Sequence, residues 1–191
     1  MYNTIKGIKN YKNIAWFLLG FYFINDALVT IFAFVHIYAK TTLSFSVSEI
    51  TILLLLVQII GFPSTLFFAW LSDKKGSKKI LLSTIFVWGM IVILSAITPT
   101  KDLFYFVAVL TGLVIGSSQS IARSWLSKII TPEKRGEFFG FNGFASKVSA
   151  TTGPILFGTI SVITSNQRIA MLSILPFFVI SFVIFAKIKE E

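Results

Sequence analysis

Two ionisable side chains, Asp26 and Lys147, stand inside stretches of sequence that are otherwise almost free of charge. Burying an acid or a base in an apolar helix is costly, so residues of this kind usually serve ion or substrate pathways. Asp26 is therefore a candidate site for a transported proton or for the amine of a solute. The alternative is an acid that burial keeps neutral and that has no further role.

The expected depths of these two residues predict that they meet. Asp26 lies 12 residues beyond Ile14, and Lys147 lies 9 residues beyond Phe138. At 1.5 Å per residue, they stand roughly 18 Å and 14 Å into the membrane. An acid and a base at similar depth lower each other's burial cost if their helices adjoin, so we predict an essential Asp26–Lys147 pair. The alternative is a lysine whose stem extends to the cytoplasmic interface.

Amide side chains in the same apolar setting are further candidates for binding a solute or a proton: Asn25, Gln58, Gln119 and Asn142. Asn142, Ser146 and Ser149 recur at helical spacing and predict one polar stripe. For Gln58 and Gln119, the competing interpretation is that they only donate hydrogen bonds between helices.

Long uncharged runs define the elements that must position these residues. A helix of ~20 apolar residues crosses the ~30 Å hydrocarbon core of a bilayer. The sequence predicts an all-α membrane protein with one bundle of six transmembrane helices. We expect a cytoplasmic segment over 1–12 and the bundle over 13–189, with helices at about 14–38, 50–71, 80–99, 103–125, 138–163 and 169–187.

The distribution of basic residues predicts the orientation. Thirteen lysines and arginines fall on the side of both termini, three on the opposite side, and Lys147 lies within a span. Positive residues accumulate in cytoplasmic loops, so both termini are expected in the cytoplasm. The membrane is expected to be a bacterial plasma (inner) membrane. The net charge of +9 therefore indicates membrane topology rather than a nucleic-acid partner.

Composition excludes several classes of site. The chain has no cysteine and one histidine, so it offers neither a disulfide framework nor a thiolate or histidine-rich metal site. It also lacks a serine-nucleophile motif and an acidic metal cluster. We therefore expect no cofactor and no metal, and we do not expect an enzyme.

Small residues and a charged loop complete the set of motifs. Gly112 and Gly116 repeat at four-residue spacing and indicate a close helix-packing face, and the Gly153–Pro154 pair indicates a packed kink. The loop after the second helix carries Asp73, Lys74, Gly76, Lys78 and Lys79. By itself it is also compatible with an ordinary positive-inside loop.

This loop resembles the motif that joins helices 2 and 3 in the major facilitator superfamily. Helix 4 and its exit, from Gly116 to Ser124, and the segment from Pro132 to Phe141 extend the likeness. Their order and spacing resemble the vacuolar amino-acid effluxers and their bacterial relatives over about 16–185, and specifically their C-terminal half. The resemblance implies that these are helices 7 to 12, that 1–12 ends a cytoplasmic linker, and that helices 1, 2, 4 and 5 of the half line a substrate cavity.

The same resemblance implies a gate. Arg123 is expected to pair with Asp73 or Glu137 and to latch the cytoplasmic side. The function implied is secondary transport of a small polar solute, with an amino acid as the candidate, by rocking against a second six-helix bundle within the lipid bilayer. The second bundle would be an N-terminal half or another copy. The alternative is a truncated or regulatory membrane protein that does not transport.

Overall fold

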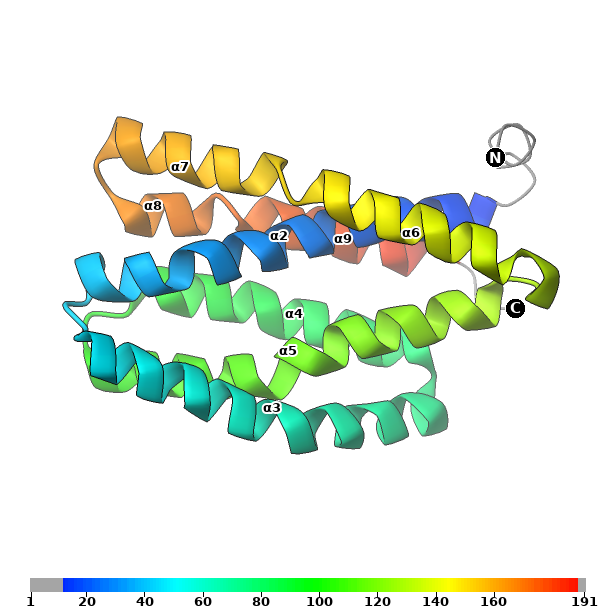
Figure 1. The fold of residues 1–191 in the computed structure, drawn as a ribbon, viewed down its shortest axis with the longest axis horizontal. Helices are drawn as coiled ribbons and strands as arrows, with labels where there is room; N and C mark the ends of the chain where they lie inside the picture. The colour runs from blue at the N-terminus through cyan, green and yellow to red at the C-terminus, as the bar shows by residue number, and fades with distance from the viewer. Residues whose placement is uncertain (1–11, 189–191) are drawn as a thin grey trace.

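The computed structural model describes residues 12–188, and all of its regular elements there are helical. They are α2 (Lys12–Thr42), α3 (Val47–Lys75), α4 (Ser77–Ile97), α5 (Lys101–Ile129), the short 3₁₀ helix η2 (Pro132–Lys134), α6 (Arg135–Ser149), α7 (Thr152–Thr164), α8 (Gln167–Leu172) and α9 (Leu175–Lys187). The helices run roughly along one long axis, with α3 on one side of the bundle and α6–α7 on the opposite side (Figure 1). The expected segment 1–12 lies almost wholly outside the described residues.

Five helical stretches within the described residues are long and apolar enough to cross a membrane: α2, α3, α4, α5 and the stretch of α8–α9. The remaining segment, fifth in chain order, consists of α6 and α7 in succession, which lie end to end in Figure 1. The chain is thus an all-α, multi-pass integral membrane protein with six spanning segments, as the sequence predicts.

The fifth and sixth segments differ from the continuous helices predicted over 138–163 and 169–187. The fifth is interrupted at Ala150 and Thr151, between α6 and α7, and the sixth at Ser173 and Ile174, between α8 and α9. A proline follows each interruption. Its ring clashes with the preceding turn and it has no N–H to donate. In contrast, α3 continues through Pro63.

Basic side chains cap helix ends where α4 runs antiparallel to α8 and α9. Lys78, at the start of α4, donates from Nζ to the carbonyls of Ala186 (2.9 Å) and Ile188 (2.6 Å) at the end of α9. Arg168, at the start of α8, donates to the carbonyls of Ala96 (2.8 Å) and Thr98 (2.5 Å) at the end of α4. A cation at a helix C-terminus satisfies free carbonyls and interacts favourably with the helix dipole.

Close packing joins α3 to α5. A Cβ added at Gly112 would lie 2.9 Å from Ile60 Cβ, and one added at Gly116 would overlap the Thr65 hydroxyl oxygen. Only glycine lets the two backbones approach this far. Both glycines therefore face α3, and Gly116 also lines a hollow between α3 and α5.

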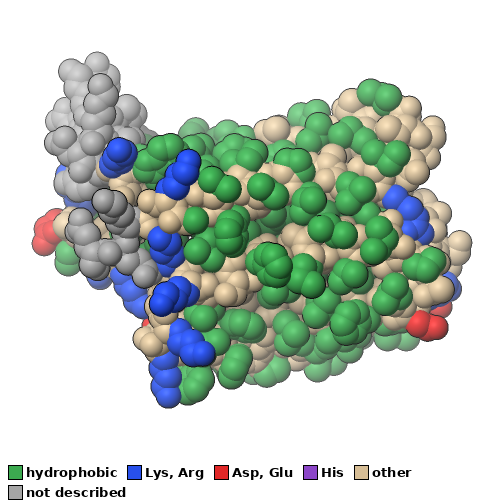
Figure 2. Space-filling view, turned by 180° about the vertical axis from the view of Figure 1, so that it is seen from behind, with side chains coloured by type: hydrophobic (Ala, Val, Ile, Leu, Met, Phe, Trp, Pro, Cys, Tyr) green, Lys and Arg blue, Asp and Glu red, His purple; other side chains and the backbone are tan. Residues whose placement is uncertain are grey.

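Charge is segregated along the long axis. Figure 2 shows basic side chains gathered at one end, a broad apolar belt, and a few charges of both signs at the other end. The described basic residues of the richer end include Lys12, Lys74, Lys75, Lys78, Lys79, Arg123, Lys128, Lys134, Arg135 and Lys187. The start of α2 and the end of α9, which are next to the two chain termini, both lie at the basic end of the bundle (Figure 1).

Candidate functional site

Asp26 lies on α2 and is completely buried. Both of its carboxylate oxygens accept the backbone N–H of Gly153, each at 2.9 Å. Gly153 is the second residue of α7, where backbone N–H groups have no partner within the helix. A negative charge is favourable at this end of the helix dipole. Asp26 therefore caps the helix that begins after the interruption.

Two neighbours of Asp26 on α2 also contact the fifth segment, Asn25 before the interruption and Tyr22 after it. Asn25 donates from Nδ2 to the Ser146 carbonyl (3.0 Å) and to Ser149 Oγ (2.9 Å), both on α6. The Tyr22 hydroxyl lies 3.0 Å from Thr152 Oγ1 at the start of α7. Non-helical backbone is tolerated at membrane depth only where protein satisfies its polar groups. One face of α2 supplies those partners on both sides of the break.

The predicted Asp26–Lys147 ion pair is absent from the described residues. Lys147 is exposed on α6, and the acid is bound by Gly153 instead. The reason is the direction of the side chain. Ser149, which reaches α2, is two residues from Lys147 and so lies about 200° around the helix. Equal depth did not place the two charges on facing sides of their helices.

Asn142 lies on the same side of α6 as Ser149 and is 6% exposed. Its Oδ1 is a buried acceptor without a hydrogen-bond partner among the described residues. Its own backbone carbonyl accepts the Ser146 hydroxyl at 2.7 Å. The predicted polar stripe of Asn142, Ser146 and Ser149 therefore faces α2 and forms part of the interhelical contact.

Gln58 and Gln119 border a separate hollow of about 440 Å³ between α2, α3 and α5. Its wall has three polar side chains, Gln58, Thr65 and Gln119, and no charged one. The Thr65 hydroxyl donates to the Gly61 carbonyl and can then only accept, so the two amides supply the side-chain donors of this hollow. Gln119 and Asn25 both border a narrow crevice. Through Gln119 the crevice adjoins the hollow, and through Asn25 it adjoins the region of Asp26.

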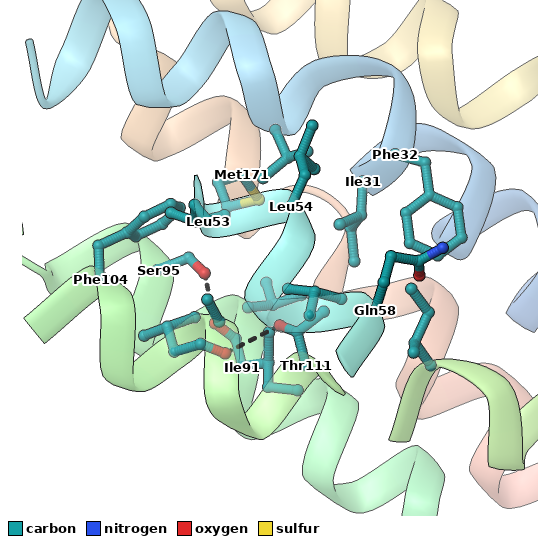
Figure 3. Close-up of a pocket in the computed structure, with 16 residues that line it drawn as sticks. Ile31, Phe32, Leu53, Leu54, Gln58, Ile91, Ser95, Phe104, Thr111 and Met171 are labelled. Carbon is teal, nitrogen blue, oxygen red and sulfur yellow. Dashed lines mark hydrogen bonds between the residues drawn. The ribbon is translucent and has the colours of Figure 1, made fainter. Parts of the chain in front are cut away.

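An apolar chamber of about 370 Å³ adjoins the hollow and shares Phe32, Gln58 and Ile115 with it. Figure 3 shows Gln58 and Phe32 at one side of this chamber and Phe104 at the other. The hydroxyls of Ser95 and Thr111 are bonded to carbonyls of their own helices, those of Ile91 and Val107. Gln58 therefore stands where a polar hollow meets an apolar chamber.

The loop between α3 and α4 differs from the predicted latch. Asp73 pairs with Lys128, whose Nζ lies 3.2 Å from Oδ1 and 3.2 Å from Ser77 Oγ. Arg123 is exposed and makes no ion pair with Asp73 in the described part of the chain. Since α5 continues to Ile129 rather than ending near 125, Lys128 reaches the loop in place of Arg123.

Other residues of the loop have structural partners. Lys74 lies over the Trp70 ring, with Nζ 4.1 Å from its centroid. Gly76 adopts a φ of 92°, which favours glycine, and so permits the tight turn from α3 to α4. Glu137 is in the first turn of α6. The sequence motif thus builds a short helix connection, with Lys78 serving α9 as a cap.

The residues that sequence reasoning missed are Gly153 as the partner of Asp26, together with Tyr22 and Thr30. The Thr30 hydroxyl donates to the Asp26 carbonyl at 2.7 Å. A Cβ added at Gly153 would overlap the hydroxyl oxygen of Thr30. The Gly153–Pro154 pair was the available signal, because a proline in a long apolar run marks backbone that needs other partners.

Comparison with known proteins gives a consistent result. The sequence profile of the family described as "Vacuole effluxer Atg22 like" matches residues 1–191. The MFS-type transporter YxiO of Bacillus subtilis is 27% identical over 188 residues, which cover 98% of this chain and 44% of that protein. Autophagy-related protein 22 of Kluyveromyces lactis is 24% identical over 202 residues, covering 100% of this chain and 41% of the relative. The chain thus spans less than half the length of these curated relatives.

Proposed function

Because the chain belongs to the vacuole effluxer Atg22-like family, we propose that it is the C-terminal six-helix half of a secondary transporter of the major facilitator type. The observation that carries this proposal is the hollow lined by Gln58 and Gln119, which offers uncharged hydrogen-bonding groups inside an apolar belt. Such a wall suits a small polar solute, and an amino acid is our candidate. The description of the family as an effluxer and the name of the Bacillus subtilis relative as a transporter support the same class.

We propose that Asp26 couples a proton to the movement. As a carboxylate, it holds the N-terminus of α7 through the Gly153 N–H and the helix dipole. Protonation removes the charge and weakens this hold, which frees the half-helix to shift during a transport cycle. Asn25 lies between this contact and the crevice bordered by Gln119, so it links the proton site to the solute hollow.

The transport test uses the chain assembled with its second bundle in liposomes and a panel of radiolabelled amino acids as the probe. Gln58→Ala and Gln119→Ala should each raise KM roughly tenfold, because each removes a hydrogen bond to the solute. Ser83→Ala, on the exposed surface of α4, is the control and should leave KM unchanged. No uptake of any probe above empty liposomes would favour a non-transporting role.

We further propose that both termini face the cytoplasm of a bacterial plasma membrane, because the basic end should stay on that side. Reporter fusions test this directly. A reporter that works only in the cytoplasm should be active after Lys187 and inactive in the loop at Ser44. A reporter that works only on the opposite side should be active at Ser44 and inactive after Lys187. The reverse pattern at both positions would contradict the orientation.

A further inference from the structure

An apolar groove of about 300 Å³ lies on the surface where α4 packs against α9. Its lining consists of glycine and apolar side chains: Ile85, Phe86, Gly89, Met90, Ile93, Leu175, Phe178, Val179 and Phe182. Phe86, Met90 and Val179 are exposed, so the groove is open to the surroundings of the bundle. Helices α4 and α9 lie behind α5 and α2 in Figure 1, and Figure 2 shows that the rear side is largely apolar between its charged ends. The groove therefore faces the hydrocarbon of the membrane.

Gly89 forms the floor of this groove. A Cβ added there would have Leu175 Cδ1 as its nearest neighbour, at 3.6 Å, which is ordinary van der Waals contact. The glycine is thus not required by a close approach of two backbones, as Gly112 is, although glycine is a poor helix former. Its missing side chain instead leaves room between Phe86 and Phe182, which also line the groove.

Lys79 stands at the basic end of the same side of α4. At 100° per residue, Lys79, Phe86 and Ile93 fall within about 40° of one another. Lys79 precedes Phe86 by seven residues, roughly 10 Å of helix. It is exposed and makes no ion pair within residues 12–188. The neighbouring Lys78 donates to carbonyls at the end of α9, which places a second cation where the two helices meet.

These dimensions match a phospholipid. Gly89 lies 12 residues beyond the start of α4 at Ser77, roughly 18 Å along the helix. One leaflet supplies about 15 Å of hydrocarbon, half of the core. A lipid with its phosphate at Lys79 would therefore lay an acyl chain along the groove as far as Gly89. At the opposite end of α4, Arg168 is only partly exposed and is already bonded to two carbonyls, so it is less available to a headgroup.

We propose that the α4–α9 groove binds one anionic phospholipid of the leaflet at the basic end, with an acyl chain against Gly89 and the phosphate at Lys79. Lysines at the membrane surface attract anionic headgroups. A second copy of the chain in the same orientation fits less well, because its own basic end would lie against Lys79 and repel it. Lipid binding at this site does not require transport, so the proposal is independent of the proposed function.

Native mass spectrometry of the purified full chain tests the headgroup contact. Dioleoylphosphatidylglycerol, which is anionic, should bind roughly tenfold more tightly than dioleoylphosphatidylcholine, which has no net charge. In Lys79→Gln this preference should fall to roughly twofold. Lys12→Gln, at an exposed position on α2 at the same end of the bundle, is the control and should keep the full preference. Inorganic phosphate at the concentration of the lipid should not displace it, because phosphate cannot fill the groove.

Matched glycines test the groove. Gly89→Leu should weaken binding of both lipids roughly tenfold, because the new side chain takes the place of the acyl chain. Gly158→Leu, where a Cβ would meet no atom within 4 Å, should leave both affinities unchanged. If Gly89→Leu fails to fold, Gly89→Cys modified with a bulky maleimide after purification replaces it, since the chain has no other cysteine.

Four results would overturn the proposal. They are equal affinity for the two lipids, an unchanged preference in Lys79→Gln, displacement of the lipid by inorganic phosphate, and unchanged binding when position 89 is filled. A dimer that separates in Gly89→Leu would also contradict it, because the occupant of the groove would then be a second copy. Lipid binding is measured without transport, so a failed transport assay does not affect the result.

Discussion

Asp26→Asn is expected to abolish proton-driven transport and to lower the free energy of unfolding by about 2 kcal/mol. The amide loses the charge that favours the N-terminus of α7. It also replaces one of the two oxygens that accept the Gly153 N–H by an NH₂ group, which cannot accept it. Stability is measured by denaturant unfolding of the purified chain, and transport in the complete assembly in liposomes.

Asp102→Asn is the matched control, since Asp102 is an exposed acid in the first turn of α5. That change should alter stability by no more than about 0.5 kcal/mol. An Asp26→Asn variant with normal stability and normal proton-driven transport would refute both the capping role and the coupling role. Normal stability with lost transport would retain the coupling role alone.

Lys147→Met provides a second check on Asp26. The predicted ion pair would make the double variant less damaged than the sum of the single variants, because removing one partner leaves the other unpaired. The structure instead binds Asp26 to Gly153 and leaves Lys147 exposed. The two changes should therefore add within about 0.5 kcal/mol in the isolated chain.

The six spanning segments were predictable because long charge-free runs and the distribution of lysines depend on membrane thickness and topology, which need no tertiary information. The family was predictable from the order of its motifs. The helix boundaries were less predictable. Helix α5 continues to Ile129 instead of ending near 125, and this extension brings Lys128 to Asp73. A helix can continue beyond the apolar run that crosses the membrane, so the polar residues after that run do not mark the end of the helix.

The candidate site was predicted in its residues but not in its contacts. Asp26 and Asn25 do face the fifth segment, yet their partners are backbone groups and a serine rather than a lysine. Depth along a helix follows from residue number, whereas the direction of a side chain depends on how the helix is rotated against its neighbours. The interruption at Ala150 and Thr151 adds to this, because it changes the rotation of α7 relative to α6.

Gly153→Ala should destabilise the chain by about 3 kcal/mol, although alanine keeps the N–H that Asp26 binds. The added methyl group would overlap the Thr30 hydroxyl oxygen and would lie 2.9 Å from Asp26 Oδ1. Helix α7 would have to move away from α2 and lose its cap. The measurement is again the free energy of unfolding of the purified chain.

Two further variants separate this packing effect from the charge of Asp26. Gly158→Ala places the same methyl group on the same helix where no atom lies within 4 Å, so it should be neutral or stabilising by up to about 1 kcal/mol. Thr30→Ala removes the overlapping oxygen, so Gly153→Ala should cost less in that background, with the crowding against Asp26 remaining. If Gly153→Ala behaves like Gly158→Ala, α7 does not approach α2 closely, and the carboxylate of Asp26 must have another partner. If the predicted difference is found, the close contact of α2 with the start of α7 adds to the hydrogen bonds of Asn25 and Tyr22 in holding the fifth segment. Under the proposed function, movement of α7 then has to break this contact.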